Sequence, residues 1–261
     1  MTQIVLLTNG NYFAAKIAKP LFSHPAIELA GIVIVTGDYK GKSGLASYKE
    51  LLKATALPYL IYKVASTLGL SFLSRMLGKK PLTVRRLAQE FQVPAFETVK
   101  VNSPESVAFV EAHQPDILLS ISCPQRIRKK LLSIPKKTSI NIHSSLLPAY
   151  AGLAPYFWVL ANGETRTGTT VHEMIEEIDK GRILAQRETK IPKGISAFSL
   201  FQTLADKGSE ALVEAILNPA SMGAKEPASY YSHPTKGAYR ALRRNGHCLV
   251  RLSELIKAAK G

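Results

Sequence analysis

Cysteine is scarce in this chain, which contains only Cys123 and Cys248. The two are far apart in the sequence and lack the close spacing of metal ligands, so no metal site is predicted. Two cysteines cannot form a disulfide framework, which favours a reducing compartment. The amino-terminal residues contain no basic segment and only a very short apolar run, unlike a signal peptide. A cytoplasmic protein is therefore expected.

Acidic residues are also few: 19 Asp and Glu face 34 Lys and Arg, which gives a formal net charge of +15. Much of the excess lies in residues 126–137 and in the segment after Met222. Such a charge attracts an anionic small molecule, a nucleic acid or an acidic membrane surface. A well-solvated basic surface without a partner is the plainer interpretation.

Long apolar runs are limited to one segment, Leu57–Leu77, and Lys63 and Arg75 interrupt it. A membrane-spanning helix needs about 20 apolar residues with few charges, so a span is not predicted. The segment is instead expected to form a helical insertion, at about residues 50–90, that packs on the core or on a second subunit of a homo-oligomer. Contact with a membrane surface is the less favoured alternative. The expected helical stripe consists of Leu57, Leu60, Ile61, Val64 and Leu68.

Compact apolar runs alternate with helical patterns along most of the chain. This order predicts an α/β fold with a Rossmann-like, doubly wound and mostly parallel sheet. We expect one domain over residues 1–220 and a short basic extension over 221–261. The predicted strands are Gln3–Thr8, Ile27–Val35, Pro94–Val99, Asp116–Ser122 and Ser139–His143, and the predicted helices are Phe13–Leu21, Thr83–Phe91 and one that Ser103 caps.

Polar side chains gather where the strand Ser139–His143 ends. Alternation places Asn141 and His143 on the same face of this strand, near the carboxyl edge of the sheet. A later strand, Gly168–Met174, leads to a turn that contains Asp179. An amide can donate a hydrogen bond to an oxyanion, an imidazole can transfer protons near neutral pH, and a carboxylate can orient the imidazole. Each residue alone could equally anchor a loop, and Asp179 could simply belong to a hairpin turn.

The ordered motifs of this region resemble the folate-dependent formyltransferases, a family that includes methionyl-tRNA, glycinamide ribonucleotide and sugar-amine formyltransferases. The resemblance is continuous from about Asp116 to Ile191. Its motifs are Asn141-Ile-His143-Ser-Ser-Leu-Leu-Pro148, Tyr150-Ala-Gly152, Asn162-Gly-Glu164, Gly168-Thr-Thr-Val-His172 and Ile178-Asp179-Lys-Gly181.

By this resemblance, Asn141 polarises the formyl carbonyl, His143 manages the protons, and Asp179 pairs with the histidine and helps to hold a water molecule. His172 is expected to support the site without transferring protons. The resemblance also implies 10-formyltetrahydrofolate as the formyl donor, with the pterin bound largely by backbone groups. The residues expected to line the folate site are Ser122, Cys123, Gln125, Arg126, Ile127, Ser145, Leu146, Leu147, Pro148, Met174, Ile175 and Glu176.

The acceptor amine is less well defined by the sequence. The residues after Met222 are too few for the barrel domain of methionyl-tRNA formyltransferases, which makes tRNA the less favoured acceptor. The loop after the first strand, Thr8–Tyr12, has only one glycine, which disfavours a phosphate cradle of the glycinamide ribonucleotide type. An anionic small molecule, such as an amino sugar nucleotide, is therefore expected. A formyltetrahydrofolate hydrolase and a non-catalytic RNA- or membrane-binding protein are the alternatives.

Overall fold

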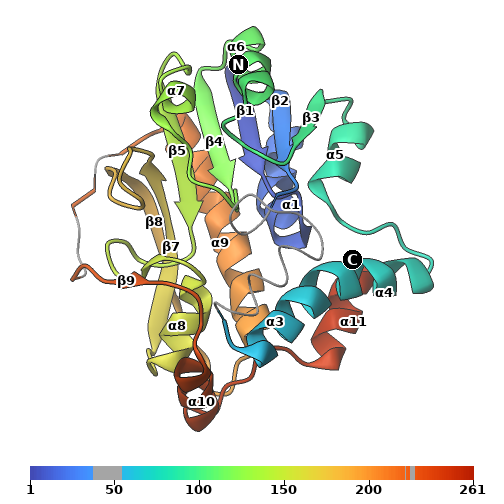
Figure 1. Ribbon diagram of the computed structural model, residues 1–261, viewed down its shortest axis with the longest axis vertical. Coiled ribbons are helices and arrows are strands. Elements are labelled where there is room, and N and C mark those ends of the chain that lie inside the picture. Colours follow the sequence, from blue (N-terminus) through green and yellow to red (C-terminus); the bar gives the residue numbers. More distant parts are fainter. Residues whose placement is uncertain (38–54, 221, 224–226) are drawn as a thin grey trace.

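The computed structural model describes residues 1–37, 55–220, 222–223 and 227–261 (Figure 1). The central sheet has seven strands in the order β3-β2-β1-β4-β5-β7-β8. Strands β1 to β5 run parallel, β7 is antiparallel to β5, and β8 is antiparallel to β7. The predicted α/β, Rossmann-like fold is thereby confirmed. The strands are β1 (Thr2–Thr8), β2 (Ile27–Val35), β3 (Ala95–Thr98), β4 (Ile117–Ile121), β5 (Thr138–His143), β7 (Arg166–Glu173) and β8 (Ile183–Lys190).

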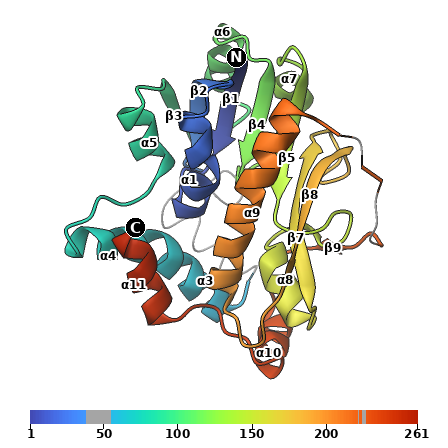
Figure 2. The same cartoon turned by 180° about the vertical axis from the view of Figure 1, so that it is seen from behind.

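Helices cover both faces of the sheet because the central strands are apolar on both faces. In β1, Ile4 and Leu6 belong to the core beneath α1 and α9, whereas Val5 and Leu7 belong to the core beneath α6 and α7. Figure 2 shows α1 and α9 in front of the sheet. The helices on these two faces are α1 (Tyr12–Ala18), α5 (Val84–Glu90), α6 (Pro104–Ala112), α7 (Lys129–Leu132) and α9 (Ala197–Leu217).

Local capping sets several of the predicted boundaries. The strand β2 spans Ile27–Val35, as the sequence predicts. The side chain of Thr83 accepts a hydrogen bond from the Arg86 amide at the start of α5, and Ser103 caps α6 through the Ser106 amide. The helical pattern predicted over Phe13–Leu21 divides into α1 and a 3-10 turn, η1 (Lys19–Phe22), because Pro20 lacks a backbone N–H.

The apolar segment 57–77 forms a nearly continuous helix made of α3 (Leu57–Val64), the π turn η3 (Ala65–Gly69) and α4 (Leu70–Met76). The sequence predicts the helix correctly but the wrong packing face. Tyr59, Tyr62 and Leu70 pack into a second core, which they share with α8 (Pro155–Ala161). Of the expected stripe only Leu60 is buried, and Leu57, Ile61, Val64 and Leu68 are exposed. Residues 50–54 of the predicted insertion lie outside the described residues.

The basic segment after Met222 folds back on the rest of the chain. Strand β9 (Tyr230–Tyr231) pairs with β6 (Ala151–Gly152) in a small second sheet. Helix α10 (Lys236–Arg244) packs on α8, and α11 (Leu252–Lys260) packs on α4. Over the described part of the chain, no helix combines the length and apolarity that crossing a bilayer requires.

Candidate functional site

The site is built at the junction of β5 and β7, where the parallel part of the sheet meets an antiparallel strand. Asn141 of β5 lies directly opposite His172 of β7, and His143 lies opposite Thr170. Ile142 points away into the core beneath α9. The alternation of β5 therefore brings Asn141 and His143 to one face, as predicted, and the register adds His172 beside them.

Hydrogen bonds indicate which ring nitrogen of His172 carries the proton. Its Nδ1 lies 2.8 Å from the Glu173 carbonyl oxygen, which can only accept, so Nδ1 carries the proton and donates. In the neutral ring, Nε2 then accepts a hydrogen bond from Asn141 Nδ2, at 3.1 Å. This contact fixes the orientation of the Asn141 amide, and within the described part of the chain its second N–H has no recorded acceptor.

The ring of His143 is held by a backbone carbonyl. Its Nε2 lies 2.9 Å from the carbonyl oxygen of Tyr150, so Nε2 donates. The other nitrogen, Nδ1, lies 3.6 Å from Asp179 Oδ2. In the neutral ring, Nδ1 carries the lone pair and can accept a proton, and the carboxylate beside it stabilises the resulting cation. The distance is long for a direct hydrogen bond and suits a bridging water molecule.

Asp179 lies between the two histidines in the loop that joins β7 and β8. Its Oδ2 accepts a hydrogen bond from the Gly152 amide at 2.8 Å, and its Oδ1 lies 3.5 Å from His172 Nε2. Burial opposes ionisation, but the attraction of a protonated His143 and the hydrogen bond from the Gly152 amide outweigh it and lower the pKa of Asp179 to about 2. The carboxylate is therefore ionised at neutral pH.

Burial has the opposite consequence for His143. Its side chain is almost fully buried, and loss of hydration lowers its pKa below the usual value of 6.5, although Asp179 and the Tyr150 carbonyl act to raise it. The imidazole is therefore largely neutral near pH 7 and available as a base. The arrangement combines an oriented amide donor, a neutral imidazole and a fixed carboxylate.

The predicted folate loop after β4 is anchored by side chains. The Gln125 amide donates to the carbonyl oxygens of Gly37 and Val99, and its oxygen accepts from the Val101 amide. Gln125 therefore joins this loop to the ends of β2 and β3. The side chain of Ile127 is buried in the core beneath α6 and α7. These two side chains position the loop rather than facing an open cleft.

Three other residues of this loop are distinguished by backbone conformation, burial or a hydrogen bond. Ser122 follows β4 directly and adopts a left-handed backbone conformation. Burial raises the pKa of the Cys123 thiol to about 12, so the thiol is protonated and a poor nucleophile. Arg126 donates to the carbonyl oxygen of Glu176, which ties this loop to the loop after β7.

The segment from Ser145 to Pro148 is fixed by hydrogen bonds to the protein itself. The hydroxyl of Ser145 donates to the Ala149 carbonyl. The Leu147 amide donates to Thr170 Oγ1, and the Leu147 carbonyl accepts from Gln186. The backbone of Leu147 is thus already hydrogen-bonded. Leu147 is buried, whereas Leu146 and Pro148 are partly exposed.

The loop after β7 presents apolar side chains beside the carboxylate. Ile175 and Ile178 are 44% and 47% exposed, and Glu176 is also exposed, whereas Met174 packs partly against the core. An exposed apolar surface in the loop that also carries Asp179 suits a planar, partly apolar ring. These residues are thus compatible with the pterin and formyl group of a reduced folate.

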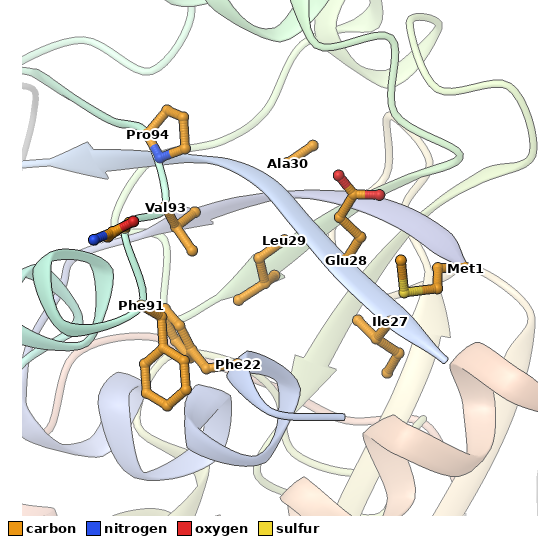
Figure 3. A pocket seen from close by; sticks show the side chains of 10 residues that line it. Met1, Phe22, Ile27, Glu28, Leu29, Ala30, Phe91, Val93 and Pro94 are labelled. Carbon is orange, nitrogen blue, oxygen red and sulfur yellow. The ribbon is translucent and has the colours of Figure 1, made fainter. Parts of the chain in front are cut away.

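One surface hollow of the described residues lies away from this cluster. It has a volume of about 480 Å³ and lies at the amino-terminal part of β2, between that strand and the segment after α5 (Figure 3). The cluster of Asn141, His143, His172 and Asp179 lies at β5 and β7, and this hollow contains none of the predicted site residues. A second hollow, of about 200 Å³, is lined by Leu146 and Tyr150, in the segment that follows β5, and by residues 227–229.

Two contributions to the site could not be found by inspecting side chains. The Tyr150 carbonyl orients His143, and the Gly152 amide binds Asp179, but every residue carries such backbone groups. The sequence gives a partial indication of these contacts, since the motif Tyr150-Ala-Gly152 begins only seven residues after His143, the last residue of β5. Gly152 has a φ of 95°, and a Cβ there would lie 2.2 Å from the Tyr231 carbonyl oxygen, so glycine is required.

Comparison with known proteins adds an independent observation. The family model described as formyl transferase matches residues 73–216. Methionyl-tRNA formyltransferase from Geobacter sulfurreducens is 40% identical over 136 residues, which cover 52% of this chain and 43% of that protein. The corresponding protein from Clostridioides difficile is 35% identical over 142 residues, or 54% of this chain and 45% of the relative. The match thus spans less than half the length of these relatives.

Solved structures share the fold at low sequence identity. A sugar N-formyltransferase from Shewanella sp FDAARGOS_354 superposes with a TM-score of 0.57 and 18% identity, over 99% of this chain and 88% of that chain. Phosphoribosylglycinamide formyltransferase from Bacillus Halodurans gives a TM-score of 0.58 and 18% identity, over 86% and 100% of the two chains. The N-formyltransferase from Helicobacter canadensis, in complex with folinic acid and dTDP-3-aminofucose, gives 0.56 and 17%, over 89% and 71%. With a family match over more than half of its residues, the chain belongs to the formyl transferase family.

Proposed function

We propose that this protein transfers a formyl group from 10-formyltetrahydrofolate to a primary amine of a small anionic molecule. The observation that carries the proposal is the buried cluster of Asn141, His143, His172 and Asp179 at the carboxyl edge of the sheet. In open α/β sheets, ligands bind at that edge.

The geometry gives each group a role. The amine nitrogen attacks the formyl carbon, and the second N–H of Asn141 donates to the oxygen that becomes negatively charged. The amine loses a proton to Nδ1 of His143, directly or through water, and Asp179 stabilises the imidazolium ion. The bond between the formyl carbon and N10 of the folate then breaks, and the proton passes to N10. Transfer is complete when the formamide and tetrahydrofolate leave.

The choice of donor rests on the exposed loop after β7 and on related structures. Ile175 and Ile178 offer an apolar surface beside Asp179. The related Helicobacter canadensis structure contains folinic acid, and a sugar 3N-formyl transferase of the same fold was solved with dTDP and 5-N-formyl-THF. The predicted contacts of residues 122–127, 145–148 and 174–176 with the folate remain part of this proposal.

The choice of a small acceptor rests on charge and on the extent of similarity. The net charge of +15 favours an anionic acceptor. Four sugar N-formyltransferase structures, one of them described as a likely one, align with 89–99% of this chain, which supports an amino sugar nucleotide. The curated relatives are methionyl-tRNA formyltransferases, so formylation of methionyl-tRNA is the second candidate.

A donor-consumption assay tests the proposal. The protein is incubated with 10-formyltetrahydrofolate and, in turn, an amino sugar nucleotide, glycinamide ribonucleotide, methionyl-tRNA or no amine, and the release of tetrahydrofolate is followed. We expect release that depends on the sugar amine. Asn141→Ala should abolish it, whereas Asn218→Ala, an exposed amide at the end of α9, should not.

The remaining outcomes separate the alternatives. Release without any amine would indicate a hydrolase, and release only with methionyl-tRNA would indicate the second candidate. Calorimetric titration with a non-transferring analogue of the donor distinguishes a missing acceptor from a missing donor. Absence of binding at millimolar analogue would refute the folate-dependent function itself.

A further inference from the structure

The helix formed by α3, η3 and α4 exposes a continuous row of large apolar side chains, here called the apolar stripe. Each step along the row is three or four residues, so all members lie on one side of the helix. Isolated exposed apolar residues are ordinary on a protein surface, but a row over five helical turns marks an interaction surface. The stripe consists of Leu57, Ile61, Val64, Leu68, Phe72 and Met76, which are 54%, 60%, 36%, 60%, 64% and 69% exposed.

The π turn keeps this row straight. Steps of four residues rotate by about 40° around an ideal α-helix, which has 3.6 residues per turn. Such a row would wind away from one face within a few turns. The wider turn Ala65–Gly69 takes up an additional residue and counters this drift between Val64 and Phe72. The two halves of the helix therefore present the stripe to the same surface.

The charge around the stripe has a single sign. Residues 51–89 contain no Asp or Glu. Arg75, Lys79 and Lys80 are exposed at the end of α4, and among the described residues none of the three is seen in an ion pair. Lys63 lies half-buried on the same helix. Apolar side chains flanked by unpaired cations are the pattern of helices that lie in the interface of an anionic membrane.

The opposite side of the helix is firmly attached to the protein. The hydroxyl groups of Tyr59 and Tyr156 are hydrogen-bonded at 2.9 Å in the second core. The Ala56 amide donates to the carbonyl of Pro234, and α11 packs on α4. In Figure 1, the helix lies on the side of the sheet toward which β1 and β4 point, which is also the side of the catalytic cluster. The stripe is thus a rigid external face of the folded protein.

We propose that the apolar stripe docks this protein on the surface of an anionic lipid bilayer. The helix lies parallel to the membrane plane, with the stripe among the acyl chains and the cations among the headgroups. It does not span the bilayer, because Tyr59, Tyr62 and Leu70 remain packed in the protein. A second copy of the chain is the poorer occupant, since two stripes with their flanking cations, on chains of net charge +15, repel each other.

Vesicle cosedimentation of the full chain tests the proposal. We expect binding to vesicles that contain phosphatidylglycerol, weakening of this binding by salt, and little binding to pure phosphatidylcholine. Combining Ile61→Ser, Leu68→Ser and Phe72→Ser should reduce binding by about tenfold for each residue. Combining Arg75→Gln, Lys79→Gln and Lys80→Gln should reduce it by on the order of 100-fold. Leu217→Ser, on the exposed end of α9, is the matched control and should bind like the parent protein.

All substituted side chains are exposed, so thermal melting should shift by no more than a few degrees. If the serine variant nevertheless fails to fold, the glutamine variant still tests whether the cations contribute to vesicle binding, since its exposed side chains leave no packing defect. Lack of binding to phosphatidylglycerol vesicles would overturn the proposal, as would equal binding of the parent and both combined variants. A third contrary result would come from light scattering without lipid. If the parent protein is a dimer and the serine variant is a monomer, the stripe binds a second copy of the chain.

Discussion

Replacing Asp179 with asparagine should destabilise the protein by an amount that depends on pH. The asparagine oxygen can still accept the hydrogen bond from the Gly152 amide, so the change mainly removes the charge facing the two histidines. The Asp179 carboxyl group has a pKa of about 2 in the folded protein, against 3.8 for an aspartate side chain that is free in water. That difference corresponds to a stabilisation of about 2 kcal/mol at mildly acidic pH, where the carboxylate is ionised and His143 can carry a proton.

The sign of the pH dependence follows from the lowered pKa. A carboxylate with a lower pKa in the folded state contributes its full stability above the pKa of the unfolded chain and loses it as pH falls toward 2. The difference in free energy of unfolding between the parent protein and Asp179→Asn should therefore be largest near pH 5 and smaller at pH 7, where His143 is largely neutral. At pH 3 it should be about half as large.

Urea unfolding at pH 7, 5 and 3 measures this difference. Asp206→Asn is the control, because Asp206 forms an exposed ion pair with Lys16, and such pairs contribute little to stability. Equal destabilisation by Asp179→Asn at all three pH values would refute the electrostatic reasoning. So would stability at pH 5 that matches the Asp206→Asn control.

Three further predictions concern the site and its loops. Asn141→Ala should lower kcat by about 10² to 10³ in a formyl-transfer assay, with little change in the melting temperature, because it removes the proposed oxyanion donor. For the neutral His143, kcat/KM should fall only below pH 6.5, and Asp179→Asn should move this acidic limb to still lower pH, since the carboxylate raises the pKa of the imidazole. Gly181→Ala should cost about 1–3 kcal/mol in urea unfolding because a Cβ would lie 1.8 Å from the Glu173 carbonyl oxygen, whereas Gly237→Ala, where a Cβ would meet only Thr235 Oγ1 at an ordinary contact distance of 3.8 Å, should cost nothing.

Much of the fold follows from local patterns in the sequence. The strand β2 is predicted to the residue, and the caps Thr83 and Ser103 fix the starts of α5 and α6. Hydrophobic periodicity cannot decide which of two apolar faces of a helix packs inward. In segment 57–77, the aromatic rings of Tyr59 and Tyr62 fill the second core, and the more aliphatic face remains outside.

The site was predictable only in part, for a related reason. Strand alternation brings Asn141 and His143 together, and the structure places Asp179 beside them. The backbone contacts of Tyr150 and Gly152 depend on the path of a loop, which side-chain identity does not encode. The proposed folate contacts stay a prediction.

The pairing of β6 with β9 determines when, during synthesis, the loop that orients His143 can be completed. The Ala151 amide donates to the Ser229 carbonyl, the Leu153 amide donates to the Tyr231 carbonyl, and the Tyr150 amide donates to the Ser229 hydroxyl. The loop that orients His143 is thus held by residues made some eighty positions later. A nascent chain that has completed every strand of the central sheet still lacks this support. Maturation of the site is therefore expected to be among the last events of folding, and to be governed by contacts that are distant in sequence.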